Sequence, residues 1–332
     1  MIIHLPKNIN RETAEQLGRD HEGILFFDDN QPILVTTSKM KQLPDALVQL
    51  GATGYASDSD MQLASRSYKS ETRLIHLGNV QFGGTTGNTV MITGPCSVES
   101  EDQLESAAKL CVELGVKVLR AGAFKPRTSP YTFQGLGLQG LKLLANMREK
   151  YGLKIITEVR DSTHTDAVIE YADIIQIGAK AMYDQGILRR CGSSGKPVLL
   201  KRGFGSTLQE FVQAAEFMLS AGNPNIMLCE RGIRTFETKT RFTLDLCGVA
   251  WLKEYTNLPV ILDPSHAIGY RYGVADLSRA CVAMGVDGLL IETHPNPAVA
   301  KSDADQQLNF DQFRALYRSL PAIASAVGRQ LV

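Results

Sequence analysis

The chain has 332 residues, of which 44% are hydrophobic and 21% are charged, and its 35 basic residues balance its 35 acidic ones. This composition is typical of a globular protein with one large core and room for a smaller domain. The net charge is zero, so the chain lacks the excess of positive charge that is typical of nucleic-acid-binding proteins. No apolar run reaches the roughly 18 residues of a membrane span. We therefore expect neither nucleic acid nor a membrane as a partner.

Six cysteines are scattered singly through apolar segments, and no CxxC pair occurs. The N-terminus also lacks the basic and apolar regions of a signal peptide. Together these features predict reduced thiols in a cytoplasmic protein. Five of the cysteines are expected to be small core residues. Cys96 is set apart by the residues that surround it.

Residues 1–60 are predicted to fold in the order β-α-β-β-α-β, which is the ferredoxin-like arrangement. Strands are expected over 2–5, 23–27, 32–36 and 53–57, with a hairpin turn at 28–31. Helices are expected over 10–17, with Asn10 as the N-cap, and over 41–50. Residues 61–89 form a polar connector with one hairpin, 72–77 against 79–82.

From residue 90 to the end at 332, strand and helix patterns alternate eight times. The strands are expected at 90–93, 116–119, 154–158, 174–178, 197–201, 226–229, 260–263 and 288–292. Helical patterns include 103–114, 138–151, 208–220, 244–254 and 274–284. The strands are continuously apolar, as in a sheet buried on both faces, so we predict an α/β fold of the TIM (β/α)8 barrel type. The alternative, a doubly wound open sheet, would place a glycine-rich turn after the first strand, where this chain has Gly94-Pro95-Cys96-Ser97.

A loop after the second barrel strand concentrates positive charge. Arg120, Lys125 and Arg127 occur within eight residues without an intervening carboxylate, and Thr128 adds a hydroxyl group. The prolines at positions 126 and 130 exclude a continuing helix or a central strand. Fixed cations beside a hydroxyl suit a phosphorylated or carboxylated ligand.

A second set of residues has side chains of the kind that bind metals. In a TIM barrel the C-terminal ends of the strands form the active site, and strands one, seven and eight, which are neighbours in a closed barrel, end near Cys96, His266 and Glu292. Asp303 follows in the next loop. Each residue alone has an ordinary structural interpretation, but their convergence favours a site for manganese, iron, cobalt or zinc. His294 and Asp305 remain alternative ligands.

The strand ends also carry an excess of cations. These are Arg120, Lys125, Arg127, Lys180, Lys201 and Arg231, with Arg202 and Arg234 as further members. A solvated rim is the ordinary interpretation. However, so many cations with so few matched carboxylates would repel one another in a confined mouth, and bound phosphate or carboxylate groups would relieve that repulsion. We therefore expect a ligand set with more than one anionic group.

Several sequence segments resemble those of the 3-deoxy-D-arabino-heptulosonate 7-phosphate (DAHP) synthase family. Enzymes of this family catalyse the first step of the shikimate pathway to aromatic amino acids. They lie at residues 94–100, 120–131, 133–137, 196–203, 228–238 and 262–267. They run through the barrel in the family's order. The ferredoxin-like N-terminal domain points to the type I beta subgroup.

The resemblance implies a reaction in which phosphoenolpyruvate condenses with erythrose 4-phosphate and phosphate is released. It assigns Cys96, His266, Glu292 and Asp303 to a divalent metal, manganese foremost. It assigns Arg120, Lys125, Lys201 and Arg231 to phosphoenolpyruvate, and Arg127 and Thr128 to the phosphate of the aldose. Lys125 is a candidate general acid and His266 is counted with it as catalytic. The resemblance also implies an aromatic amino acid effector bound by the N-terminal domain, and a tetramer.

The chain departs from the family where the fourth barrel strand ends. The family usually reads Gly-Ala-Arg-Asn-Met-Gln, and this chain reads Gly-Ala-Lys-Ala-Met-Tyr at 178–183. Lys180 keeps the charge for substrate binding but lacks the guanidinium fork. Two alternatives therefore stay open. One is a related synthase that uses another aldose phosphate, such as arabinose 5-phosphate, and the other is a non-catalytic paralogue that binds an effector.

Overall fold

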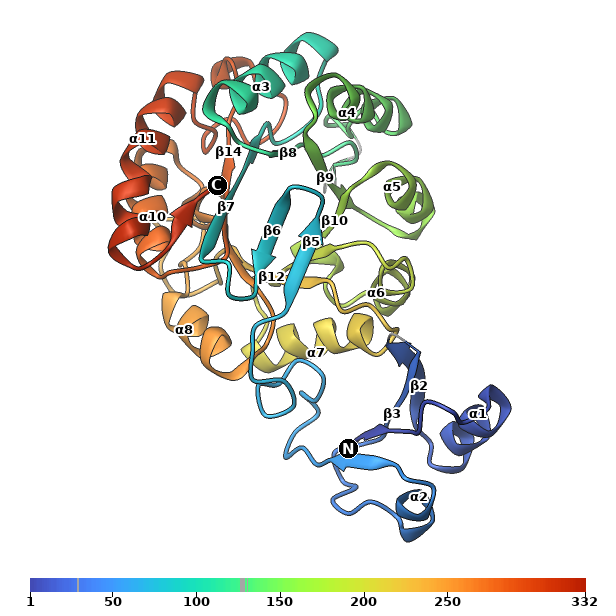
Figure 1. Ribbon diagram of the computed structural model, residues 1–332. Helices are drawn as coiled ribbons and strands as arrows, with labels where there is room; N and C mark the ends of the chain where they lie inside the picture. Colours follow the sequence, from blue (N-terminus) through green and yellow to red (C-terminus); the bar gives the residue numbers. More distant parts are fainter. Residues whose placement is uncertain (29, 126–128, 130) are drawn as a thin grey trace.

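The computed structural model describes residues 1–28, 30–125, 129 and 131–332, and most of them form a closed parallel barrel (Figure 1). Neighbouring strands pair in chain order, and the last pairs with the first through five residue pairs. The strands are β7 (Asn88–Gly94), β8 (Val118–Arg120), β9 (Lys154–Val159), β10 (Ile174–Ile177), β11 (Val198–Lys201), β12 (Ile226–Glu230), β13 (Val260–Leu262) and β14 (Gly288–Glu292). The predicted TIM barrel is confirmed.

Helices surround the barrel. They are α3 (Glu101–Leu114), α4 (Leu138–Tyr151), α5 (Thr165–Tyr171), α6 (Gln185–Gly192), α7 (Leu208–Leu219), α8 (Leu246–Tyr255), α9 (Pro264–Ile268), α10 (Arg271–Ala283) and α11 (Phe310–Ala326), with the 3-10 turns η1 (Ser162–His164), η2 (Ala179–Ala181) and η3 (Pro297–Val299). Side-chain caps fix several starts. Ser100 caps α3, and capping boxes begin α7 at Thr207 and α11 at Asn309. The five helical patterns taken from the sequence agree with the structure to within three residues at each end.

The N-terminal segment has the predicted ferredoxin-like order. Its elements are β1 (Ile2–His4), α1 (Arg11–Asp20), β2 (Ile24–Asp28), β3 (Gln31–Val35), α2 (Asp45–Gln49) and β4 (Thr53–Tyr55), in an antiparallel sheet of order β2-β3-β1-β4. Asn10 caps α1 by accepting a hydrogen bond from the Thr13 amide at 2.7 Å, as predicted. The helix expected over 41–50 is wrong in length, because Pro44 is its N-cap and disfavours helical backbone in the residue before it.

A hairpin covers one end of the barrel. Its strands are β5 (Leu74–Leu77) and β6 (Val80–Gly83), and Figure 1 shows them lying across the front of the barrel strands. Ile75 and Phe82 are fully buried and share one apolar cluster with barrel residues such as Val90 and Ile92. The hairpin therefore closes the end of the barrel from which β7 starts, and a polar site can form only at the opposite end.

The structure differs from the sequence prediction in the burial of one cysteine and in one additional strand. Cys111, Cys191, Cys229 and Cys281 are buried as predicted, but Cys247 is exposed in the first turn of α8. A short strand, β15 (Gln330–Leu331), pairs in parallel with the start of β7 and was not predicted, because two residues show no periodicity.

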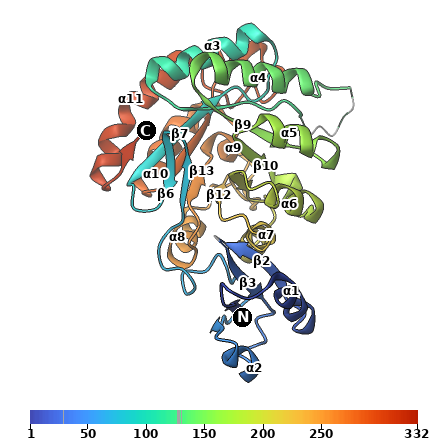
Figure 2. The ribbon, with the colours of Figure 1, turned by 45° about the vertical axis from the view of Figure 1, so that its right-hand side comes forward.

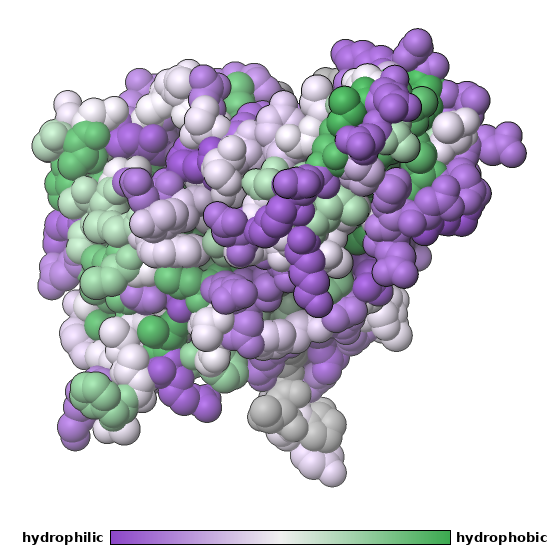
Figure 3. Space-filling model, turned by 90° about the horizontal axis from the view of Figure 1, so that it is seen from below, coloured by the Kyte–Doolittle hydropathy of each residue, from purple (hydrophilic) through white to green (hydrophobic). Residues whose placement is uncertain are grey.

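No described helix is long and apolar enough to cross a membrane. On the face that Figure 3 shows, hydrophilic residues predominate and hydrophobic ones form separate groups.

The N-terminal sheet lies beside α7, as Figure 2 shows. Ile2 and Ile33 are buried in the main apolar cluster of the barrel helices. The connector is fixed to α7 by one carboxylate: Glu216 accepts hydrogen bonds from the amides of Gln62 at 2.7 Å, Ala64 at 2.8 Å and Leu63 at 3.2 Å. Burial nevertheless raises the pKa of Glu216 to about 7. The start of the connector is therefore held against the barrel by a titratable group.

We expect the stability of this protein to fall between pH 5 and pH 8, because the raised pKa of Glu216 favours the folded state only while the carboxyl group is protonated. The contribution, on the order of 3 kcal/mol, is fully present below the ordinary pKa near 4.5 and is lost as the pH passes about 7. Glu216→Gln should flatten this pH dependence. Melting temperatures of both proteins across the range check it, and parallel curves would contradict it.

Candidate active site

The predicted functional residues meet at the end of the barrel opposite the hairpin. A cavity of about 250 Å³ opens there, over the carboxyl ends of the strands. Its lining includes six residues selected from the sequence, namely Lys125, Lys180, Lys201, Arg231, His266 and Asp303. Arg127 and Thr128 lie outside the described residues.

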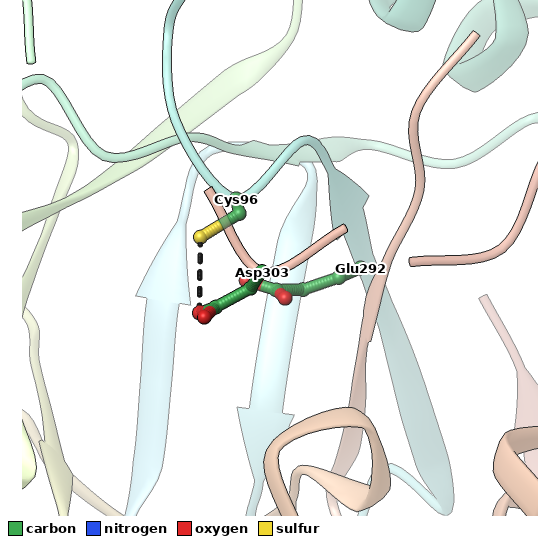
Figure 4. Close-up of side chains that lie close together, drawn as sticks. All are labelled: Cys96, Glu292 and Asp303. Carbon is green, nitrogen blue, oxygen red and sulfur yellow. Dashed lines mark hydrogen bonds between the residues drawn. The ribbon is translucent and has the colours of Figure 1, made fainter. Parts of the chain in front are cut away.

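Four side chains of metal-ligand type lie together at one side of this cavity. Cys96, Glu292 and Asp303 each offer one ligand atom, and these three atoms lie within 4.8 Å of one another (Figure 4). The Cys96 Sγ atom is 3.3 Å from Asp303 Oδ2. His266 Nε2 lies 3.4 Å from Glu292 Oε1 and 3.9 Å from Asp303 Oδ2. The structure thus brings the four predicted residues together: three of them form one compact group, and the His266 imidazole lies beside its two carboxylates.

The two alternative ligands lie elsewhere. His294 Nε2 faces Glu99 Oε2 at 3.5 Å, and its Nδ1 accepts a hydrogen bond from the Asn296 amide. Asp305 is exposed to solvent. Among the described residues neither belongs to the group around Cys96.

Local backbone features hold the group in place. Gly94, at the end of β7, has a φ of 144°, and a Cβ atom there would lie 2.2 Å from the Arg120 carbonyl oxygen, so only glycine lets the Cys96 loop approach β8. Asp303 adopts a φ of 46°, which is unusual for a residue with a side chain and is common at functional sites. Its neighbour Ser302 is fixed by a 2.8 Å hydrogen bond to Ser97.

Neighbouring groups set the protonation states. Burial and the nearby Glu292 raise the pKa of the Cys96 thiol to about 12, although the Lys125 ammonium lies 3.0 Å from its sulfur. Burial lowers the pKa of His266, which favours the neutral imidazole that a metal requires. Burial opposes the charge of Glu292, but His266 and Arg120 lower its pKa below the ordinary value. A metal bound here would therefore displace a proton from Cys96.

Several cations already have carboxylate partners. Arg120 Nη1 lies 2.7 Å from Glu292 Oε1, and Lys201 Nζ lies 2.5 Å from Asp263 Oδ2. Arg202 is buried between Glu230 at 2.9 Å and Asp245 at 2.8 Å. The expectation of few matched carboxylates is wrong for these three, because their partners come from other strands and loops.

The remaining cations define where an anion is still needed. No ion pair of the described residues involves Lys125, Lys180 or Arg231, and all three line the cavity. Arg231 is buried, and its Nη1 atom has no hydrogen-bond partner in the described part of the chain. A buried donor without a partner is costly unless a ligand satisfies it.

Some residues that contact the cavity or the predicted ligand group were missed by the sequence analysis. Arg241 lines the cavity, lies 3.8 Å from Asp303 Oδ1 and donates a hydrogen bond to Gln306 at 2.9 Å. Gln306 in turn donates to Glu292 Oε2 at 2.6 Å. Asp263, noted only as a strand-end residue, holds His266. Arg241 could have been suspected as a cation in the long β12–α8 loop, but nothing in the sequence marks Gln306.

Comparison with known proteins agrees with this geometry. Residues 69–327 match the DAHP synthetase I family. The chain belongs to that family. It is 48% identical over 327 residues to the phospho-2-dehydro-3-deoxyheptonate aldolase of Thermotoga maritima, covering 98% of this chain and 94% of the relative. A 2-dehydro-3-deoxyphosphooctonate aldolase of Fusobacterium nucleatum is 33% identical over 257 residues, covering 72% of this chain and 91% of the relative.

Solved structures show the same likeness. The crystal structure of the Thermotoga maritima DAHP synthase superposes with a TM-score of 0.80 at 38% identity and covers 100% of this chain and 99% of its own. A truncated form of the Thermotoga maritima enzyme gives a TM-score of 0.76 at 43% identity, with 81% of this chain and 98% of its own covered. The chain is thus an enzyme of this family with the fold predicted from its sequence.

Gly178→Ala should impair the cavity wall. A Cβ atom at Gly178 would lie 2.6 Å from Glu158 Oε1, and Glu158 is held by a 2.6 Å hydrogen bond from Gln176. The added methyl group would break that bond and push Glu158 into the cavity, so we expect kcat/KM to fall about tenfold. Gly205→Ala is the matched control, since nothing lies within 4 Å of its Cβ position. Equal activity of the two variants would contradict this.

Proposed function

We propose that this protein condenses phosphoenolpyruvate with erythrose 4-phosphate to give DAHP and phosphate. The observation that carries the proposal is the meeting of Cys96, His266, Glu292 and Asp303 beside cations that lack carboxylate partners, in one cavity. Membership in the DAHP synthetase I family supports it, as does the Thermotoga relative that covers nearly the whole chain.

In this proposal Cys96, His266, Glu292 and Asp303 hold a divalent metal, which supplies a Lewis acid for the aldehyde of the aldose. The donor set fits such an ion, because a thiolate, an imidazole and carboxylates are ligands of manganese, iron, cobalt and zinc. Arg120 and Gln306 orient Glu292 from opposite oxygens, at 2.7 and 2.6 Å. Asp263 lies 2.7 Å from His266 Nδ1 and so directs Nε2 toward the other ligands.

Lys125 is the proposed general acid. Its Nζ atom lies 3.1 Å from the Cys96 carbonyl oxygen and 3.0 Å from the sulfur, at the edge of the ligand group. Burial disfavours its charge, but the Glu158 carboxylate and the Cys96 sulfur, once ionised, raise the pKa of Lys125, so it carries its proton at neutral pH. Carbon 3 of phosphoenolpyruvate attacks the aldehyde carbon, and Lys125 donates a proton to the resulting alkoxide. Water adds at the electron-deficient carbon 2 and gives up a proton, which replaces the one that Lys125 donated. The bond between carbon 2 and the phosphate oxygen then breaks, phosphate takes the remaining hydroxyl proton, and a ketone forms at carbon 2.

The anionic groups of the substrates have proposed partners. Lys201, Arg231 and Arg120, with Lys125, would bind phosphoenolpyruvate, and the unpartnered Nη1 of Arg231 supports this. Arg127 and Thr128 would bind the aldose phosphate, and this assignment falls outside the described residues. Binding both anionic substrates in fixed positions orients their reacting carbon atoms toward each other, and this orientation accounts for much of the rate enhancement.

A related aldose is the second candidate substrate. Lys180 stands where the family usually has arginine, is exposed at the cavity in η2 and offers a point charge instead of a fork. The similarity to 2-dehydro-3-deoxyphosphooctonate aldolases keeps arabinose 5-phosphate as an alternative. The whole-chain Thermotoga relative favours erythrose 4-phosphate.

A phosphate-release assay tests the function. We expect release only when phosphoenolpyruvate, an aldose phosphate and a divalent metal are all present, and most rapidly with erythrose 4-phosphate. Chelation should abolish activity, and Cys96→Ala should lower it by at least about a hundredfold through weaker metal binding. A panel of aldoses with manganese, iron, cobalt and zinc identifies the preferred pair. Full activity of Cys96→Ala would remove the metal role, and preference for arabinose 5-phosphate would select the second candidate.

We also propose three functional units, a regulatory domain over 1–60, a connector over 61–89 and a catalytic barrel over 90–332, with assembly as a tetramer. A second cavity, of about 200 Å³, lies between the N-terminal sheet and the barrel. His4, Tyr55 and Tyr68 contribute rings to it, and Lys69 and Arg73 contribute cations. Rings and charges suit an aromatic amino acid as effector.

Removal of residues 1–60 should abolish inhibition by tyrosine or phenylalanine while the barrel keeps its activity. The truncated Thermotoga form shows that a shortened relative folds. Phosphate-release rates of both lengths, measured with and without each amino acid, check this. Inhibition that persists in the shortened protein would place the effector site in the barrel.

A further inference from the structure

A stack of arginine and phenylalanine side chains forms one wall of the active-site cavity. The guanidinium carbon of Arg231 lies 4.7 Å from the ring centroid of Phe242, and that of Arg241 lies 5.7 Å from the same centroid. Phe204 stacks on Phe242 with centroids 5.5 Å apart and an interplanar angle of 20°. One aromatic ring therefore serves two cations at once, in a geometry where cation–π attraction is effective.

The backbone that carries this ring is held firmly. The Phe242 amide donates to the Ala267 carbonyl at 2.8 Å, and the Arg241 amide donates to Ile268 at 3.0 Å. Gly232 has a φ of 95°, and a Cβ atom there would lie 2.7 Å from Phe242 Cβ. The turn after β12 thus packs directly against the ring and α9, which fixes the position of Phe242.

The two guanidinium groups are not equally satisfied. Arg241 Nη1 donates to Gln306 Oε1 at 2.9 Å and lies 3.8 Å from Asp303 Oδ1, which is a long ion pair. Arg231 is buried with a free Nη1, as described above. Two cations on one ring repel each other, and an anion between them would satisfy the free donor and relieve that repulsion.

We propose that Arg241 and Arg231 bind one anionic group of phosphoenolpyruvate together, and that Phe242 is a positioning residue that orients both guanidinium groups. The inference rests on the proposed function for the identity of the ligand. It adds Arg241 as a substrate-binding residue, and it gives the Phe242 ring a role that an aliphatic side chain of similar size would not fulfil.

Three variants separate these roles. Arg241→Gln removes the charge, Phe242→Leu keeps apolar bulk without a ring, and Phe242→Tyr restores the ring. Arg189→Gln is the matched control, because Arg189 also lies over an aromatic ring, that of Phe217 at 5.3 Å, but neither residue lines the cavity. Each variant is assayed for kcat, for KM of both substrates, for the Kd of phosphoenolpyruvate alone by calorimetry, and for metal affinity.

We expect Arg241→Gln to raise KM and Kd for phosphoenolpyruvate by about tenfold, the loss typical of one charge-assisted contact. Its kcat should stay within about threefold and its metal affinity unchanged. Phe242→Leu should raise the same Kd by roughly threefold to tenfold, and Phe242→Tyr and Arg189→Gln should match the wild type. Melting temperatures confirm that the variants are folded.

Two results would overturn the inference: an unchanged Kd for phosphoenolpyruvate in Arg241→Gln, or a loss confined to metal affinity, which would make Arg241 a support for Asp303 only. Equal behaviour of Phe242→Leu and Phe242→Tyr would remove the positioning role of the ring. Absence of condensation by the wild type would contradict the proposed function, while Kd still tests the binding of the anion independently.

Discussion

The carboxylate of Asp263 joins the two halves of the active site. One oxygen, Oδ2, lies 2.5 Å from Lys201 Nζ and 2.7 Å from His266 Nδ1, and the other accepts the His266 amide at 3.0 Å. Burial opposes its charge, but His266 and Lys201 hold the pKa of Asp263 well below its ordinary value. The imidazole of His266 and the ammonium group of Lys201, which are proposed to bind a metal and an anionic substrate, are therefore oriented by a single buried negative charge.

This arrangement divides the cations of the barrel mouth into two kinds. Arg120, Lys201 and Arg202 are neutralised by buried carboxylates, so their charge is balanced before any ligand arrives. Lys125, Lys180 and Arg231 line the cavity and have no carboxylate partner in the part of the chain that the structure describes. An anionic substrate is then attracted to a few positions, and the fixed ion pairs supply a preorganised polar environment around them.

The fold, and the proximity of the four residues with metal-binding side chains, could be predicted from the sequence because both depend on local patterns. Apolar strands end in polar residues, and barrel closure places Cys96, His266 and Glu292 together. The partners of Arg120 and Arg202 were not predictable, since pairing across strands depends on side-chain direction. Arg241, Phe242 and Gln306 lie in loops without periodicity. The short α2 and the exposed Cys247 show that proline position and helix orientation modify a simple apolar pattern.

The pairing of β14 with β7 also has a consequence for synthesis of the chain. Glu292 lies beside Gly94 in that pairing, so the strand that carries one of the proposed metal ligands closes against the strand that precedes Cys96, another of them. While the ribosome is still translating the segment before β14, β7 and β13 each have an unpaired edge, and exposed strand edges promote association with other chains. The nascent barrel therefore depends on protection of these edges until β14 emerges, and the ligand group is complete only when Asp303 follows.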